Sequence, residues 1–307
     1  MDDYRHNPVL REPRRYRQPL ADQIRGYKRL DPKAKPQYAV PVSVIEHIHH
    51  QAHTTPNPHW SHQVKTTRAA TADLITVAFY FLLRVGEYTR PAKSRSDTLT
   101  VPFRVGDITL RDANHHRIDP TAPLEQLLTA TEATMKIENQ KNGMQGGVIH
   151  QEATGLPHCP IKALARRIHN IMSNGGTLFT PIYQSYTAPG KAYYISPQQV
   201  TAMVRDAAGA IGMYEDTIGF KRSDISSHSL RAGGAMAMHL NGASMETIKK
   251  VGRWKGDTFL MYIHDQISAF TTGLSTQMSN RIPFRQIAGP TLLEQSNQAH
   301  LRHGPTI

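Results

Sequence analysis

The sequence lacks several features that would narrow its function at once. It has a single cysteine, Cys159, so an internal disulfide and a cysteine-rich zinc cluster are both excluded. It has no uninterrupted apolar run of the ~18 residues that a membrane-spanning helix needs. Its first residues have no apolar core, so we expect no secretory signal. These absences favour a reducing compartment, which would be the nucleus in a eukaryote and the cytoplasm otherwise.

Acidic residues are also scarce. Lys and Arg number 36 against 24 Asp and Glu, which gives a net charge of +12 with every His neutral. A surface of this sign binds polyanions, and we expect nucleic acid rather than a membrane because no basic amphipathic helix stands out. A soluble enzyme that is merely basic would show the same balance. Charge alone therefore leaves both classes open.

The length and the apolar content predict one large core with loose ends. The chain has 307 residues and is 39% hydrophobic. We expect a basic arm with a short helix over 1–38, a mainly helical α+β catalytic domain over 39–282, and a polar tail over 283–307. The domain should carry a small antiparallel sheet, because a strand over 105–110 and a hairpin over 131–152 are the only clear β patterns.

Helices account for most of the predicted elements. A helix opens at Pro41, another begins at Pro160 and ends at the Gly175–Gly176 pair, and a third follows the Ser196–Pro197 cap. Apolar spacing predicts the others over 20–30, 67–87, 229–240, 245–251, 258–263 and 267–278. The 67–87 segment is so apolar that it should lie in the core.

The segment SSHSLRAGGA at 226–235 can hold an anion. His228 and Arg231 are three residues apart at the start of a helix, so they share one face. Backbone N–H groups and the helix dipole favour negative charge there. The small residues 232–235 should let backbone or DNA approach closely. For this spacing alone, a chance pair of surface residues is the simpler explanation.

Five further positions change that assessment. Arg84 ends an apolar stretch, where a lone guanidinium is costly to bury, and Glu87 can pair with it. Lys141 falls in the predicted hairpin turn, with Lys136 as its rival on the strand. Near the end of the helical region, Trp254 can donate its indole N–H, or serve as a core aromatic, and Tyr262 has a phenol that can attack phosphorus.

In this order the motifs resemble those of the tyrosine recombinases, the group of phage integrases and the Cre-like and Xer-like enzymes. The matching segments are LLRVGEY (82–88), QKNG (140–143), HSLR (228–231), GRW (252–254) and YIH (262–264). The resemblance spans about residues 39–280 and is closest to eukaryotic mobile-element members. Only 1–38 precede it where the family places a helical core-binding domain, so we expect a truncated or minimal form.

The resemblance implies a DNA strand transferase that needs neither metal nor cofactor. Tyr262 would attack the scissile phosphate and form a 3′-phosphotyrosyl link. Lys141 would protonate the departing 5′-oxygen, and His228 would accept or shuttle the tyrosyl proton. A second 5′-hydroxyl could then reverse the step on a new strand, as site-specific recombination and DNA integration require.

The resemblance also assigns the residues that stabilise the charge of the transition state. Arg84 and Arg231 would grip non-bridging phosphate oxygens with planar forks, while Trp254 donates to the phosphate and Glu87 fixes Arg84. The expected partner is double-stranded DNA, bound by a homotetramer assembled from free monomers. Further DNA contacts are predicted at Arg14, Arg15, Arg17, Lys136 and Arg253.

Two alternatives stay open at this point. A decayed recombinase would bind DNA without cutting it, and a single-strand-nicking topoisomerase would use the same chemistry without a defined site. The cluster of His47, His49, His50 and His53 suggests a metal site, but no acidic or cysteine partner completes it, so we predict no metal.

Overall fold

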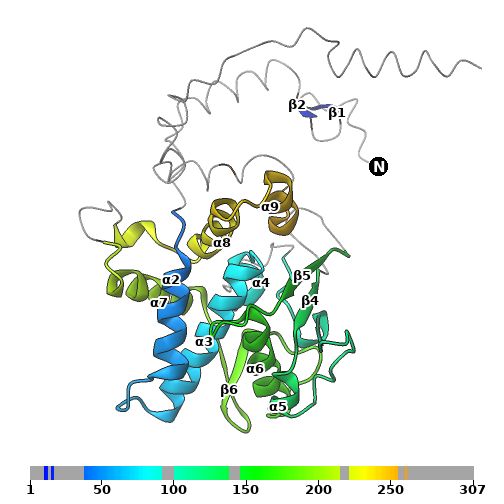
Figure 1. The fold of residues 1–307 in the computed structure, drawn as a ribbon, viewed down its shortest axis with the longest axis vertical. Helices are drawn as coiled ribbons and strands as arrows, with labels where there is room; N and C mark the ends of the chain where they lie inside the picture. Colours follow the sequence, from blue (N-terminus) through cyan, green and yellow to red (C-terminus); the bar gives the residue numbers. More distant parts are fainter. Residues whose placement is uncertain are drawn as a thin grey trace, which may run out of the picture. The chain divides into compact units, whose positions relative to one another are not determined.

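The computed structural model describes residues 38–91, 100–137, 146–214 and 221–254, together with 10–12, 15–16 and 260. The chain divides into two compact units, Met1–Asp265 and Gln266–Ile307, and the second lies outside the described residues. The α-helices of the first unit (Figure 1) are α2 (Val42–His49), α3 (His62–Tyr80), α4 (Val85–Tyr88), α5 (Leu124–Leu127), α6 (Pro160–Met172), α7 (Pro197–Ala210), α8 (His228–Leu240) and α9 (Met245–Gly252).

Short antiparallel strands complete the fold. The three-stranded sheet has the order β3-β4-β5 and is built from β3 (Ile108–Arg111), β4 (Glu132–Lys136) and β5 (Val148–Glu152). Two ribbons pair β6 (Gln184–Ala188) with β7 (Lys191–Tyr194), and β1 (Leu10–Glu12) with β2 (Arg15–Tyr16). Shorter helical turns are η2 (His50–Thr54), η3 (Val105–Asp107) and η4 (Arg222–Asp224). The predicted mainly helical α+β fold with a small antiparallel sheet is confirmed.

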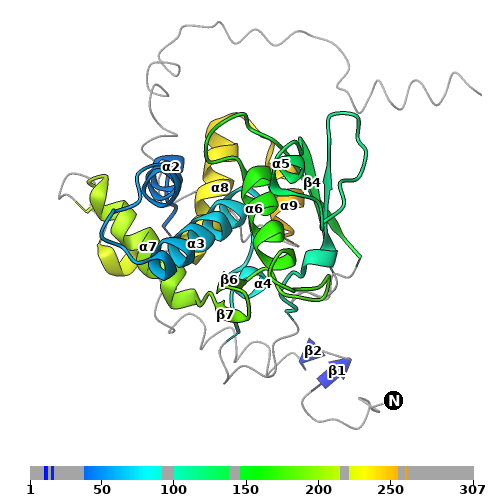
Figure 2. The same ribbon diagram turned by 90° about the horizontal axis from the view of Figure 1, so that it is seen from below.

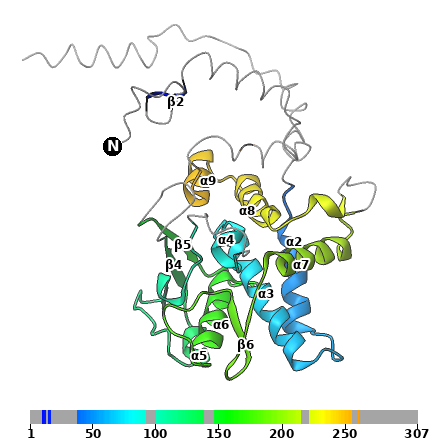
Figure 3. The ribbon, with the colours of Figure 1, turned by 180° about the vertical axis from the view of Figure 1, so that it is seen from behind.

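Helix α3 is the centre of the core. Its residues 70–79 are all buried, because it packs against α2, α6 and α8 at once. Figure 2 shows α6 beside α3, and Figure 3 shows α8 and α9 on the side of α4. A helix that is apolar on every face needs such neighbours, so the apolar content of this segment explains its central place. None of the described helices is both long and apolar enough to span a bilayer.

The prediction of one helix over 67–87 is wrong. Helix α3 begins five residues earlier, capped by Ser61, whose Oγ accepts from the N–H of Val64 at 3.3 Å. It ends at Tyr80, and Leu82 adopts a left-handed backbone with φ of 50° before α4 begins. Apolar periodicity runs through this break because the turn residues are also buried. The break frees the Leu82 carbonyl from helical hydrogen bonding.

Most other predicted elements are confirmed. The Pro160 and Ser196–Pro197 starts, the hairpin pairing of β4 with β5, and the helices after residues 228 and 245 all stand where the sequence placed them. The predicted strand over 105–110 opens instead as the turn η3, and β3 follows it. The ribbon β6-β7 was not predicted. The predicted helices over 20–30 and 267–278 lie outside the described residues, and of the one over 258–263 only Leu260 is described.

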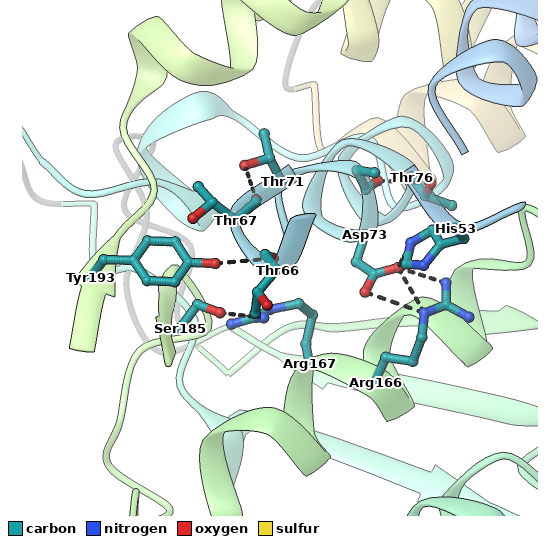
Figure 4. Close-up of polar contacts among 11 residues, drawn as sticks. His53, Thr66, Thr67, Thr71, Asp73, Thr76, Arg166, Arg167, Ser185 and Tyr193 are labelled. Carbon is teal, nitrogen blue, oxygen red and sulfur yellow. Dashed lines mark hydrogen bonds and ion pairs between the residues drawn. The ribbon is translucent and has the colours of Figure 1, made fainter. Parts of the chain in front are cut away.

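A buried ionic cluster connects α3 to α6 and η2 (Figure 4). Arg166 donates to Asp73 Oδ1 from Nη2 at 2.6 Å and from Nε at 3.0 Å, and His53 Nε2 lies 3.1 Å from the same oxygen. Burial raises the pKa of Asp73, but Arg166 and His53 outweigh it, so the net pKa is lowered. The acidic neighbour that the sequence did not reveal for the histidine cluster is thus Asp73, already paired with an arginine. Among the described residues, no His, Cys, Asp or Glu group suits a metal.

Glycines let α8 cross the core closely. A Cβ on Gly233 would lie 2.1 Å from the carbonyl oxygen of Val40, and one on Gly234 would lie 2.3 Å from that of Phe79. The N–H of Val40 also donates to Ser229 O at 3.2 Å. The close approach predicted for residues 232–235 is therefore present, and the groups that come close are the backbone carbonyls of Val40 and Phe79.

Replacing Gly234 should destabilise the fold through this crossing. We expect Gly234→Ala to lower the free energy of unfolding by about 1–3 kcal/mol or more, because α3 backbone cannot yield as a flexible side chain would. Urea unfolding followed by circular dichroism measures the change. Gly86→Ala is the matched control, since its Cβ would meet only Thr100 Cγ2 at 3.6 Å. Equal stability of the two variants would contradict the packing described.

Acid should destabilise the fold partly through His49. Burial, followed by the charges of His53 and Arg166, lowers the pKa of His49 to about 4 from 6.5. Between these values the unfolded chain binds a proton that the folded chain refuses, so stability falls as the pH drops, by at most about 1.4 kcal/mol per pH unit. Urea titrations at pH 6.5 and 4.5 measure how much the free energy of unfolding falls between the two values. This fall should be smaller in His49→Gln than in the wild type. The exposed His59→Gln should behave as the wild type; an unchanged loss in both would refute this assignment.

Candidate active site

Arg84 lies directly after the break that ends α3. It is the N-cap residue of α4, with φ of −79° and ψ of 146°. Its backbone N–H donates to Glu87 Oε2 at 2.9 Å, and its Nη1 donates to Glu87 Oε1 at 3.2 Å. The predicted Arg84–Glu87 pair is confirmed. The side chain of Arg84 keeps 20% of its surface exposed, whereas that of Glu87 keeps only 1%.

Glu87 is the carboxylate around which the cluster forms. Its side chain is 1% exposed and receives the two donors of Arg84 together with Arg253 Nη2 at 3.1 Å. A buried carboxylate needs such donors to offset its loss of hydration. Its own backbone is fixed as well, since Glu87 O accepts from the N–H of Phe103 at 2.9 Å. Glu87 thus joins a residue of LLRVGEY to one of GRW.

The Leu82 carbonyl joins the second arginine motif to the same place. Leu82 O accepts from Arg231 Nη1 at 2.7 Å and from Arg253 Nη2 at 2.8 Å. Arg231 also donates from Nη2 to Gly252 O, at the end of α9. The helix break is what makes Leu82 O available, because inside a continuous helix this oxygen would accept from a backbone N–H four residues on.

Trp254 packs under Arg231. The guanidinium carbon of Arg231 lies 4.3 Å from the centre of the indole ring, a cation–π distance. Gly252 makes room for this ring, because a Cβ there would lie 1.6 Å from Trp254 Cζ3. The indole ring therefore packs against the guanidinium of Arg231. The phosphate contact predicted for its N–H stays a prediction.

The cluster has an excess of positive charge. Within the described residues, Arg84 and Arg253 pair with the carboxylate of Glu87, and Arg231 shares the Leu82 carbonyl with Arg253, so the arginines of the cluster outnumber its carboxylate. Burial lowers the pKa of Arg253; Glu87 opposes this, and the charge of Arg84 adds to it. An anion such as a phosphate would relieve this repulsion, and Arg forks bind its oxygens in pairs.

The structure also places three other predicted residues. His228 is the exposed first residue of α8, and its backbone N–H donates to Ser226 Oγ at 3.2 Å. Arg231, one helical turn further along α8, is buried, so the anion-binding face predicted for the two residues stays a prediction. Lys136 is exposed at the end of β4, paired in register with Val148. Arg15 lies in β2.

Several predicted residues lie outside the described part of the chain: Lys141, Tyr262, Arg14 and Arg17. Their roles remain predictions. Sequence reasoning predicted Arg253 as a DNA contact, whereas the structure places its side chain, 3% exposed, against Glu87. The one local sign of this was its position after Gly252 at a helix end, where a left-handed residue is common. No sequence signal marked the Leu82 carbonyl.

A substitution at Gly252 should displace the indole ring of Trp254 from Arg231. In a Trp60→Phe background, Trp254 is the single tryptophan, because the chain has two. We expect Gly252→Ala to push the ring off Arg231 and to shift its fluorescence maximum to longer wavelength, with stronger acrylamide quenching. Gly86→Ala should leave both readings unchanged. An unaltered spectrum in Gly252→Ala would show that the ring does not lie against residue 252.

Comparisons with known proteins add little to this geometry. No protein-family model matches the chain, and no curated protein matches it by sequence. Among solved structures, the crystal structure of XerA recombinase resembles the chain with a TM-score of 0.44 and 16% sequence identity, over 82% of this chain and 67% of that chain. This score and this identity are too low to assign an activity, so function has to be inferred from the site itself.

Proposed function

We propose that the chain is a DNA strand transferase of the tyrosine-recombinase type, with Tyr262 as its nucleophile. What supports the proposal is that Arg84, Arg231 and Arg253 meet around Glu87 and Leu82 O. These residues come from three of the five motifs that resemble the family. Chance surface residues would not converge on a neighbouring carbonyl and carboxylate from positions 149 and 166 residues away in the chain.

The charge of the cluster suits phosphoryl transfer. In the proposed step the Tyr262 oxygen bonds to phosphorus while the bond from phosphorus to the 5′-oxygen breaks. The phenol proton passes to His228, and Lys141 gives a proton to the 5′-oxygen. The transition state spreads negative charge over the phosphate oxygens, where Arg84 and Arg231 are proposed to bind. The bond energy stays in the phosphotyrosyl link, so a second 5′-hydroxyl can reverse the step.

The proposal also covers the DNA partner, the assembly and the location of the enzyme. The net charge of +12 supports binding to double-stranded DNA through its phosphates, with an affinity that falls steeply with salt. We further propose that four copies assemble on DNA, that the enzyme is of the eukaryotic mobile-element type serving DNA integration, and that it works in the nucleus. Arg14, Arg15, Arg17 and Lys136 would then contact the backbone outside the cleavage point.

A covalent adduct tests the reaction directly. The probe is a pool of fluorescent nicked duplexes with a randomised core, in which the short downstream fragment that carries the freed 5′-hydroxyl diffuses away after cleavage. We expect the wild-type chain to form a slow-migrating protein–DNA band on a denaturing gel, and Tyr262→Phe to form none. Arg84→Ala and Arg231→Ala should slow its formation by about 10²-fold or more each.

Tyr193→Phe is the matched control, because the Tyr193 hydroxyl donates to Thr66 O at 3.2 Å, within the core region of Figure 4. It should keep the adduct. An adduct that persists in Tyr262→Phe would overturn the assignment of the nucleophile. Salt-sensitive binding with no adduct would favour the silent DNA-binding alternative, and relaxation of supercoiled plasmid without a defined site would favour the topoisomerase.

A further inference from the structure

Arg253 occupies a strained position for a long side chain. It is the C-cap residue of α9, with φ of 59° and ψ of 41°, a left-handed conformation that glycine or asparagine adopts most readily. Its N–H donates to Lys250 O at 3.1 Å, which closes the helix. This conformation directs the side chain of Arg253 into the protein interior. A glycine would adopt the same backbone more easily but would have no side chain to make contacts there. The strain therefore calls for an explanation in the side chain.

The side chain contacts both groups that hold the other arginines. A single nitrogen, Nη2, donates to Leu82 O at 2.8 Å and to Glu87 Oε2 at 3.1 Å. Leu82 O also holds Arg231, and Glu87 also holds Arg84. Arg253 is thus the residue that connects the two arginines predicted to grip phosphate.

Burial excludes a direct contact of Arg253 with DNA in this conformation. Its side chain is 3% exposed, and its Nε and Nη1 have no hydrogen-bond partner within the described part of the chain. A buried guanidinium with two unsatisfied donors is a poor way to stabilise a fold. Arg253 instead forms an ion pair with Glu87, which is also the ion-pair partner of Arg84. Without Arg253, Arg84 would be the one charged partner that Glu87 keeps among the described residues, and it would be less available to an anion.

We propose that Arg253 is a positioning residue, which sets Arg84 through Glu87 and Arg231 through Leu82 O. This inference rests on the proposed function, because it names what makes the phosphate grip effective. The reach of arginine is essential to it, because Nη2 contacts the carbonyl and the carboxylate together. A lysine ammonium has enough N–H donors, but its Nζ is one bond nearer to Cα, so from the same backbone position it would fall short of this pair of acceptors.

Arg253→Lys separates geometry from charge and size. We expect the rate of adduct formation at saturating nicked duplex to fall by about 100-fold, with the DNA dissociation constant changed by less than about 3-fold. Arg167→Lys is the matched control. Arg167 is another buried arginine, which donates to Ser185 Oγ at 3.0 Å and to Gln184 O at 2.5 Å, between α6 and β6. That variant should lose thermal stability and keep the wild-type rate.

Each outcome decides the matter. Wild-type rates in a folded Arg253→Lys, or equal rate losses in both lysine variants, would overturn the positioning role. If Arg253→Lys does not fold, Arg253→Gly replaces it, because glycine suits the left-handed backbone. Added methylguanidinium should then raise its rate about 10-fold while methylammonium does not; no rescue would overturn the proposal. Absence of any adduct with the wild-type chain would instead overturn the proposed function, and this inference with it.

Discussion

One buried carboxylate organises the candidate site. Glu87 accepts from the backbone N–H and guanidinium of Arg84 and from the guanidinium of Arg253. Because Glu87 is almost fully buried, its charge must be balanced by hydrogen-bond donors. The same hydrogen bonds fix the positions of the donor groups. The rest of the site follows: α4 begins where its N-cap residue meets Glu87, and α9 ends where Arg253 turns inward.

The break between α3 and α4 supplies the second anchor. A continuous helix would have kept the Leu82 carbonyl for its own backbone, and Arg231 would have lost that hydrogen bond. The left-handed backbone of Leu82 carries a cost, and the two guanidiniums that bind its oxygen offset that cost. Local strain and the positive cluster are therefore two aspects of one arrangement. Strain of this kind concentrates at functional sites.

Caps and turns made the elements around the site predictable. Proline at the starts of α6 and α7, and the apolar spacing of α8 and α9, act within a few residues, so sequence alone located them. The end of α3 was not predictable, because its apolar pattern continues through buried turn residues. The ribbon β6-β7 was missed although Pro189 and Gly190 mark its turn, since neither strand has clear alternation.

The sequence by itself determined the chemistry on offer: a basic chain, a helical α+β pattern, and ordered Arg, His, Trp and Tyr motifs with Glu87 set to pair Arg84. These features are local or compositional, so no folding is needed to see them. Only the tertiary structure decided that Arg253 faces inward to Glu87 and that Trp254 lies under Arg231. The direction of a side chain at a helix end depends on its backbone angles and on distant neighbours, which local sequence does not encode.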